Sequence, residues 1–317
     1  MAEEKSHPPS SILHPRPFLI AGPTASGKSE IALLLAEKIG GEIISVDSMQ
    51  VYRGLDIGTA KPSAEERARV KHHLIDVADL NEAFDAARFV ALARAAMREI
   101  QARQRTPILC GGTGLYFKAL LAGLGSAPPS DAALREELEA LPLESLLAEL
   151  AERDPVTFGK IDRQNPRRVV RAVEVIRLTG RPFSAQRSDW QTSGSASEFC
   201  SIGIARRSEE LKARIDRRVE AMFAAGLVDE TRHLLERGLE KNRTAMQALG
   251  YRQVVEHLRG ERSLAETIEL VKARTRQFAK RQMTWFRRQA TLEWLEVDAD
   301  QTTAEIVSRI SSFQTRA

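Results

Sequence analysis

The stretch GPTASGKS, residues 22–29, constrains this chain more than any other feature, because it joins a short apolar run to a helical pattern. Glycines in such a loop let backbone N–H groups converge on phosphate oxygens at the start of a helix. Lys28 adds a positive charge, and Ser29 can offer its hydroxyl to Mg²⁺. The motif therefore predicts a phosphate-binding loop, and it leaves open whether the ligand is ATP or another diphosphate.

Apolar runs and helical patterns alternate along the first 123 residues. A helix is expected directly after the phosphate-binding loop, closed by Gly40 and Gly41, and another over residues 84–104. Strands that alternate with helices predict a parallel sheet with helices on both faces, as in P-loop NTPases. Short buried strands are expected at residues 17–22, 42–46, 72–77 and 106–112.

The pattern changes after residue 123. Residues 131–187 have an almost wholly helical pattern, which Ser130 or Asp131 can cap, and apolar strands return at 199–205 and 291–297. The sequence therefore predicts an α/β protein with a P-loop NTPase-like sheet and a helical insertion. The expected parts are a disordered leader over residues 1–16, a core over 17–127 and 196–317 with a helical C-terminal part, and a helical insertion over 128–195.

Basic residues gather in two places, although the net charge is only +4 and the pI is near 9.2. Residues 271–288 hold seven basic residues and no acidic one, and a second cluster lies at 163–177. Two such patches suggest a long anionic partner. The alternative is a pair of solvated helix faces.

Features of membrane or secreted proteins are missing from the sequence. No apolar stretch approaches the ~20 residues that span a bilayer, and the N-terminal stretch lacks the apolar centre of a signal peptide. Cys110 and Cys200 have neither metal-site spacing nor a disulfide framework. We therefore expect a cytoplasmic protein that does not bind membranes.

Asp47 directly follows the predicted strand 42–46, at the edge of an open α/β sheet where ligands bind. A carboxylate there could ligate Mg²⁺ or accept a proton from a nucleophile. A capping or turn aspartate is the alternative. The stretch DSMQVYRGLDIGTAKP, residues 47–62, is too long and too polar for a simple connection, which favours a functional loop.

The stretch GGTGLY, residues 111–116, follows the strand with the clearest apolar pattern. Its glycines leave room for a ligand close to the backbone, and Thr113 presents a hydroxyl at the same sheet edge. With Lys28 and Asp47 expected nearby, this turn is predicted to form a third wall of one site.

Two further patterns allow more than one interpretation. His72 and His73 are neighbours in a predicted strand and face opposite sides, so they cannot easily share one metal. We interpret them as structural or loop-positioning residues. Arg214 and Arg218 lie four residues apart on a predicted amphipathic helix over residues 211–230, with Leu211, Ile215, Val219 and Met222 on its core face. This arginine pair is either a solvated basic face or a clamp for a diphosphate.

Taken together, these motifs resemble the tRNA dimethylallyltransferase (tRNA isopentenyltransferase) family over residues 17–297. The stretch at 47–62 is the most specific of them. The resemblance also rests, in the family's order, on GPTASGKS, HHLID, GGTGLY, NPRRVVRAVEV, LKARIDRRVEAM, ALGYRQ and AKRQMTWFR. Eukaryotic relatives often carry a C-terminal zinc finger, so the lack of cysteine after Cys200 is expected for a bacterial form.

The resemblance implies transfer of a dimethylallyl group from dimethylallyl diphosphate to the N6 amine of an adenosine. That adenosine lies 3′ of the anticodon in tRNAs that read codons beginning with U. Asp47 would be the base and Thr113 would contact the reacting centre, while Ser29 would bind Mg²⁺. The diphosphate would be held by Gly22, Thr24, Ala25, Ser26, Gly27, Lys28, Ser29 and Arg218.

The same resemblance gives the basic patches a partner, the anticodon stem-loop of tRNA, and implies a monomeric enzyme. Basic side chains would grip phosphates, and the target base would leave its stack. For Trp285 a core position is the alternative. The implied tRNA contacts are Asp47, Ser48, Met49, Gln50, Thr113, Arg135, Arg167, Arg168, Arg171, Gln247, Gly250, Tyr251, Arg252, Lys280, Arg281, Gln282, Trp285 and Arg287.

Three other functions stay open at the level of sequence. An adenylate isopentenyltransferase acting on free AMP, ADP or ATP shares the phosphate-binding loop and the aspartate, but it does not need the insertion or the basic patches. A P-loop small-molecule kinase should turn over ATP and should lack the loop at 47–62. A non-catalytic RNA-binding protein leaves Lys28, Asp47 and Thr113 without a purpose.

Overall fold

The computed structural model describes residues 16–187 and 198–315. The chain divides into two compact units. The first unit contains the described residues up to Lys118 together with those from 198 onward, and the second begins at Ala119. The predicted insertion begins at residue 128, which lies inside the second unit. Residues 1–15 of the predicted leader lie outside the described residues.

A sheet of six parallel strands forms the centre of the first unit, which confirms the predicted α/β class. Its strand order is β3-β2-β4-β1-β5-β6, so β4 and β5 flank β1 on its two sides. The strands are β1 (Phe18–Ala21), β2 (Gly41–Val46), β3 (His72–His73), β4 (Thr106–Gly111), β5 (Cys200–Ala205) and β6 (Glu293–Glu296).

Strand β3 is shorter than the predicted strand at 72–77. Leu74 and Asp76 have φ angles of 61° and 56°, in the left-handed region, which interrupts an extended chain. The backbone beyond them instead pairs with the loop that follows β2, where the Val77 N–H donates to the Val51 carbonyl at 2.8 Å. The segment after β3 therefore belongs to the loop cluster at the sheet edge.

Helices cover both faces of the sheet, as predicted. On one face, α1 (Lys28–Ile39) and α14 (Thr303–Ser311) share a core with strand residues such as Ile20 and Ile202. On the other face, α3 (Ala86–Ala102) packs on β4 and β2 and buries Phe89 fully. Gly40 ends α1 with a φ of 65°, while Gly41 already belongs to β2.

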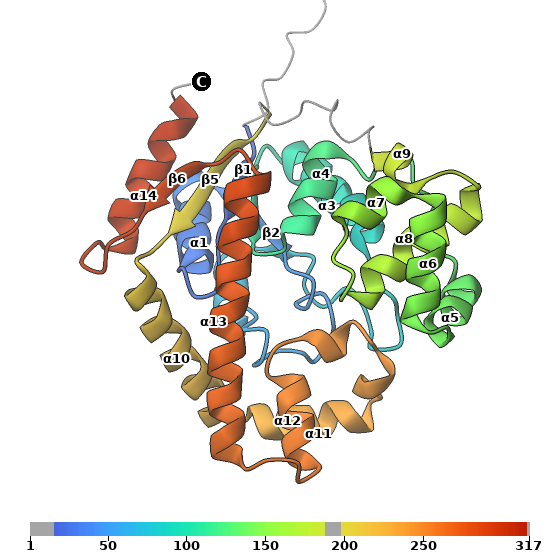
Figure 1. The fold of residues 1–317 in the computed structure, drawn as a ribbon. Coiled ribbons are helices and arrows are strands. Elements are labelled where there is room, and N and C mark those ends of the chain that lie inside the picture. The colour runs from blue at the N-terminus through green and yellow to red at the C-terminus, as the bar shows by residue number, and fades with distance from the viewer. Residues whose placement is uncertain (1–15, 188–197, 316–317) are drawn as a thin grey trace, which may run out of the picture. The chain divides into compact units, whose positions relative to one another are not determined.

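The C-terminal part of the first unit is helical. The predicted helix over residues 211–230 is in fact two helices, α10 (Ser208–Ala224) and α11 (Leu227–Glu236), because Gly226 turns the chain with a φ of 99°. On α10, Ile215 and Val219 are buried, whereas Leu211 and Met222 are half-buried. The other helices of this unit are α2 (Ala64–Arg69), α4 (Gly114–Ala122, which runs into the second unit), α12 (Tyr251–Leu258) and α13 (Leu264–Gln289), which packs along α10 (Figure 1).

The regular elements among the described residues of the second unit are all helices, as the sequence predicted. Leu138, Leu150 and Val173 belong to its fully buried core. Of the two predicted caps, Asp131 accepts from the Leu134 N–H. The helices are α5 (Ala132–Ala140), α6 (Leu143–Arg153), α7 (Pro155–Lys160), α8 (Pro166–Thr179) and α9 (Phe183–Arg187).

Glu174 on α8 is fully buried and joins several parts of the second unit. Its carboxylate accepts from the Ser130 hydroxyl at 2.6 Å, from Arg135 at 2.8 Å and from Arg171 at 2.7 Å. Burial would raise the pKa of Glu174, but hydrogen bonds from Ser130 and Arg171 outweigh it and hold the pKa below its ordinary value. The ionised carboxylate therefore stabilises the fold of this unit.

Replacing Glu174 with Gln should lower the free energy of unfolding by about 2–3 kcal/mol at neutral pH. An amide carries no charge to pair with the arginines, and its single acceptor oxygen cannot replace both carboxylate oxygens, each of which accepts two hydrogen bonds. The folded-state pKa is depressed, so this stabilisation is complete above the unfolded pKa of about 4.3 and is lost as pH falls through the folded pKa. Denaturant unfolding measured at pH 7.5 and near pH 4 should show a smaller difference in unfolding free energy between the wild type and the Glu174→Gln variant at the lower pH. A difference that stays constant with pH would contradict the role of the ionised carboxylate. The control is Glu136→Gln, which changes an exposed carboxylate.

Candidate active site

The parallel strands bring four loops to one edge of the sheet. The loops after β1, β2, β4 and β5 begin at Gly22, Asp47, Gly112 and Arg206. The Thr113 N–H donates to the Val46 carbonyl at 3.2 Å, which ties the turn after β4 to the end of β2. The structure therefore brings the predicted loops at Lys28, Asp47 and Thr113 together.

Two arginines hold the phosphate-binding loop from the outside. Arg214 Nε donates to the Ala25 carbonyl at 2.8 Å, and Arg206 Nε donates to the Ser26 carbonyl at 2.8 Å. Ala25 and Gly27 have φ angles of 63° and 93°, a left-handed backbone that an alanine adopts only when its surroundings hold it there. Since C=O and N–H of a trans peptide point in opposite directions, these contacts fix the directions of the loop's N–H groups.

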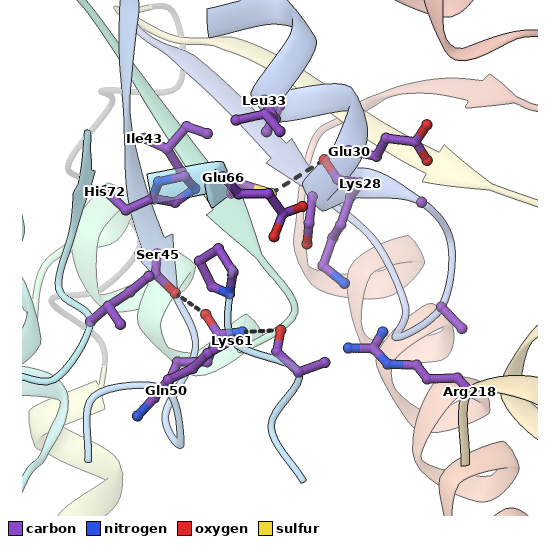
Figure 2. Close-up of a pocket in the computed structure, with 18 of the residues that line it drawn as sticks. Lys28, Glu30, Leu33, Ile43, Ser45, Gln50, Lys61, Glu66, His72 and Arg218 are labelled. Carbon is purple, nitrogen blue, oxygen red and sulfur yellow. Dashed lines mark hydrogen bonds between the residues drawn. The ribbon is translucent and has the colours of Figure 1, made fainter. Parts of the chain in front are cut away.

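Beside this loop lies a cavity of about 430 Å³, here called the loop cavity. Lys28 and Arg218 point into the same space (Figure 2), and Arg217 also lines it. The opposite wall is partly apolar, with Leu33 and Ile43. The loop cavity thus combines a strongly cationic end with an apolar one, which suits a ligand that carries a diphosphate on a hydrocarbon group.

Burial lowers the pKa of the Lys28 ammonium, Arg218 lowers it further, and the Asp47 carboxylate opposes the shift. An anionic ligand would supply the missing counter-charge. Cys110 lies next to this lysine, and its thiol donates to the Lys28 carbonyl at 3.5 Å. Burial raises the pKa of Cys110 to about 11, so the thiol is protonated near neutral pH and is a poor nucleophile.

Asp47 and Thr113 line a second cavity of about 360 Å³, here called the Asp47 cavity. Asp47 Oδ1 accepts from the backbone N–H groups of Met49 and Gln50 at 2.8 and 3.2 Å, while no described residue donates to Oδ2. The Thr113 hydroxyl oxygen accepts from the Ser48 N–H at 3.1 Å. The turn-ordering alternative for Asp47 is therefore observed at Oδ1, and its predicted role as a base stays a prediction.

Arg218 lines both the loop cavity and the Asp47 cavity. Burial lowers the pKa of its guanidinium, and the nearby Asp47 carboxylate acts in the opposite direction. Of the predicted arginine pair, Arg214 orders the phosphate-binding loop and Arg218 stands between the two cavities. The arginine pair is therefore more than a solvated basic face.

Exposed basic side chains follow α13 beyond the Asp47 cavity, which Arg281 also lines. Lys280, Arg281 and Arg287 are exposed, as are Gln247, which precedes α12, and Arg252 within it. Most of the basic patch predicted at residues 271–288 lies at the surface, whereas Lys272 is buried and pairs with Glu220 and Glu269.

Trp285 on α13 packs only partly into the protein. It is half-buried, its ring meets Phe286 edge-on, and a Cβ on Gly114 would lie 2.3 Å from it.

Several residues predicted to bind RNA or to face a ligand have partners inside the protein. Gln282 is buried, accepts from the Thr24 N–H at 2.9 Å and donates to the Gly112 carbonyl at 3.0 Å, so it joins two loops of the site. Tyr251 is fully buried. In the second unit, Arg135 and Arg171 are paired with Glu174, whereas Arg167 and Arg168 are exposed. Sequence alone did not show that these polar side chains have partners inside the protein.

Both histidines have polar partners inside the protein, and His72 also lines the loop cavity. His72 Nδ1 lies 2.8 Å from the Val70 carbonyl, and His73 Nε2 lies 2.7 Å from the buried Glu42 carboxylate. Among the described residues, no group of three or more His, Cys, Asp or Glu side chains is arranged to hold a metal ion. No described helix has the length and apolar character needed to cross a bilayer.

Sequence reasoning missed Arg206 and Lys61. Arg206 directly follows β5, just as Asp47 directly follows β2. The same argument from strand ends could therefore have placed Arg206 at the edge of the sheet where the site lies. Lys61 is almost fully buried, and its ammonium donates to the Tyr52 carbonyl at 2.6 Å and pairs with Asp56 and Asp76. It holds the loop at 47–62 together, which its motif alone did not reveal.

A protein-family comparison matches residues 50–289 to the family described as IPP transferase. A tRNA dimethylallyltransferase of Geobacter metallireducens is 48% identical over 285 residues, which cover 89% of this chain and 92% of that protein. The site and these matches define a prenyl-group transferase with a P-loop fold. The chain belongs to the IPP transferase family, among the tRNA dimethylallyltransferases.

Solved structures agree with this assignment. The tRNA isopentenylpyrophosphate transferase of Bacillus halodurans has 40% identity and a TM-score of 0.68, with 95% of this chain and 97% of that chain covered. A eukaryotic dimethylallyltransferase acting on tRNA has 26% identity and a TM-score of 0.80, with 94% and 79% covered. Both likenesses extend over nearly the whole of this chain.

Replacing Arg214 with Ala should weaken binding of inorganic pyrophosphate about tenfold, equivalent to about 1.4 kcal/mol, because the Ala25 carbonyl loses its partner and the loop loses its shape. Isothermal titration calorimetry measures the effect. Arg217→Ala is the matched control, since it removes an equal charge from the same cavity without touching a loop carbonyl. Equal losses in the two variants would show that charge alone, and not loop geometry, sets the affinity.

Proposed function

We infer that this chain transfers a dimethylallyl group from dimethylallyl diphosphate to the N6 amine of an adenosine in tRNA. The acceptor is the adenosine 3′ of the anticodon, in tRNAs that read codons beginning with U. The observation that carries this inference is Arg218, which lines both the cationic loop cavity and the Asp47 cavity. A diphosphate held at Lys28 can thereby present its carbon to an acceptor held beside Asp47.

The reaction forms one bond and breaks another at the same carbon. The N6 lone pair attacks C1 of the dimethylallyl group while the C1–O bond breaks and its electron pair leaves with the diphosphate. The amine proton passes to Asp47 Oδ2, to which no described residue donates. Because Oδ1 is held by the Met49 and Gln50 N–H groups, the carboxylate keeps one orientation throughout.

The departing diphosphate gains negative charge at its bridging oxygen, and the cations of the loop cavity stabilise that charge. Lys28 and Arg218 supply positive charge from two sides of the cavity, and the backbone of residues 22–29 supplies N–H donors at the start of α1. The apolar wall at Leu33 and Ile43 excludes water from the hydrocarbon group and so limits hydrolysis.

Mg²⁺ fits this site as a partner of the diphosphate. Ser29 is exposed in the loop cavity and offers one hydroxyl oxygen, and the described residues contain no cluster of carboxylates that would compete for the ion. Mg²⁺ commonly takes one or two protein ligands and completes its shell with phosphate oxygens and water. When bound, it would neutralise charge on the leaving diphosphate.

The anticodon stem-loop is proposed to lie along the exposed basic residues. Lys280, Arg281 and Arg287 on α13 offer contacts to phosphates near the Asp47 cavity, and Arg167 and Arg168 offer contacts on the second unit. The target base must leave its stack to reach that cavity. We place this reaction in the cytoplasm and propose that the chain acts as a monomer.

Free adenylate is the rival acceptor, and ATP-dependent phosphorylation is the rival reaction. One experiment separates these two rivals from the proposed reaction. The protein is supplied with Mg²⁺, dimethylallyl diphosphate labelled at C1, and either tRNA or AMP. We expect label in tRNA and none in AMP, with no consumption of ATP when ATP is added. Label in AMP alone would overturn the proposed acceptor, and ATP turnover without label transfer would overturn the reaction.

Changing Asp47 to Ala should lower the single-turnover rate of transfer by roughly 10²–10⁴-fold, the usual contribution of a general base. Asp47→Asn keeps the shape and can still accept from the Met49 N–H, so it separates loss of the base from loss of the turn. Rapid-quench measurement at saturating substrates gives the rates, and filter binding checks that tRNA is still bound. An unchanged rate with tRNA bound would show that Asp47 is not the base.

A further inference from the structure

The tip of the loop at 47–62 rests on two side chains from helices that lie far away in the sequence. The Glu230 carboxylate on α11 accepts from the Ile57 N–H at 2.9 and 3.1 Å and from the Gly58 N–H at 3.4 Å. The Tyr251 hydroxyl on α12 donates to Glu230 at 2.6 Å and accepts from the Gly58 N–H at 3.1 Å. One carboxylate and one phenol thus accept from both N–H groups of the turn. Glu230 and Tyr251 are here called the clamp, and the turn at Ile57 and Gly58 is the clamped turn.

The fit around this turn is close. A Cβ on Gly58 would lie 2.5 Å from the Tyr251 ring, so only glycine lets the loop approach it. Burial raises the pKa of the Tyr251 hydroxyl above its ordinary value, and the Glu230 carboxylate raises it further. The phenol is therefore a protonated donor at any physiological pH, and the contact with Glu230 persists.

From this turn, a short series of hydrogen bonds leads to Asp47. The Gln50 side-chain amide donates to the Thr59 and Ala60 carbonyls, each at 3.2 Å, directly after the clamped turn. The Gln50 backbone N–H in turn donates to Asp47 Oδ1. Gly58 and Thr59 also line the Asp47 cavity. The position of the clamped turn therefore helps to set the direction in which the Asp47 carboxylate points.

One member of the clamp, Tyr251, belongs to the segment 247–252, which also reaches the Asp47 cavity. Exposed Gln247 lines the Asp47 cavity, and exposed Arg252 directly follows Tyr251 in the chain. A nucleic acid bound to these two side chains would touch the same segment that supplies the clamping phenol.

We propose that Glu230 and Tyr251 are positioning residues that hold the Asp47 carboxylate in its working direction and couple it to the segment 247–252. This inference rests on the proposed transfer of a dimethylallyl group to tRNA with Asp47 as base. Neither residue touches substrate; both act through the turn at Ile57 and Gly58. Loss of the clamp should therefore slow the chemical step and leave binding at the phosphate-binding loop intact.

The test is a double-mutant cycle between Glu230→Ala and Asp47→Ala in the full chain, with single-turnover transfer to tRNA as readout. Wild type is measured first, so that a chain that transfers nothing counts against the proposed function alone. Glu230→Ala should slow transfer about 10- to 100-fold, as expected for a misplaced catalytic group, with the affinity for pyrophosphate unchanged. In the Asp47→Ala background the same change should have no further effect, because there is no base left to misplace.

An equal slowing of transfer by Glu230→Ala in both backgrounds would overturn the proposal, because it would show a general loss of structure. Tyr251→Phe removes only a hydroxyl and should behave like a weaker Glu230→Ala, and an unchanged rate for this variant would also overturn it. Glu236→Ala, an exposed carboxylate on the same helix, is the matched control and should leave the rate unchanged. Circular dichroism establishes that each variant is folded.

Discussion

Parallel pairing of β2, β4, β1 and β5 is the constraint on which the rest of this site depends. Parallel strands end at the same edge, so loops that lie up to 184 positions apart in the chain, from Gly22 to Arg206, meet there. Each loop then brings one kind of group: backbone donors, a carboxylate, a hydroxyl or a guanidinium. The chemistry of the site follows from this convergence more than from any single motif.

Arginine serves two purposes around the phosphate-binding loop. Arg206 and Arg214 bind carbonyl oxygens, and so they shape the loop without needing to touch a ligand. Lys28 and Arg218 line the loop cavity, where burial lowers the pKa of each cation. A buried cation without a counter-charge is unfavourable, so a diphosphate is the partner that this cavity favours. The same cations suit a departing diphosphate, whose charge increases as the bond breaks.

Much of this could be predicted from the sequence, since local patterns carry it. The phosphate-binding loop, the parallel sheet and the place of Asp47 at a strand end all follow from spacing and polarity along the chain. Sequence did not reveal that Gln282 joins two loops, that Tyr251 is buried against Glu230, or that Glu174 engages Arg135 and Arg171. Most of those contacts join residues that are far apart in the sequence, whereas Arg171 and Glu174 lie three residues apart on α8. Even there, nothing local distinguishes an arginine that binds a buried carboxylate from one that binds a phosphate.

In the proposed reaction the diphosphate at Lys28 is a leaving group, and the hydrocarbon attached to it is the group that the protein transfers. Dimethylallyl diphosphate labelled both at C1 and at its β-phosphorus tests this claim directly in one reaction with tRNA. We expect all transferred carbon label in tRNA and an equal amount of phosphorus label in inorganic pyrophosphate. Phosphorus label in the tRNA product, or released as monophosphate, would contradict it.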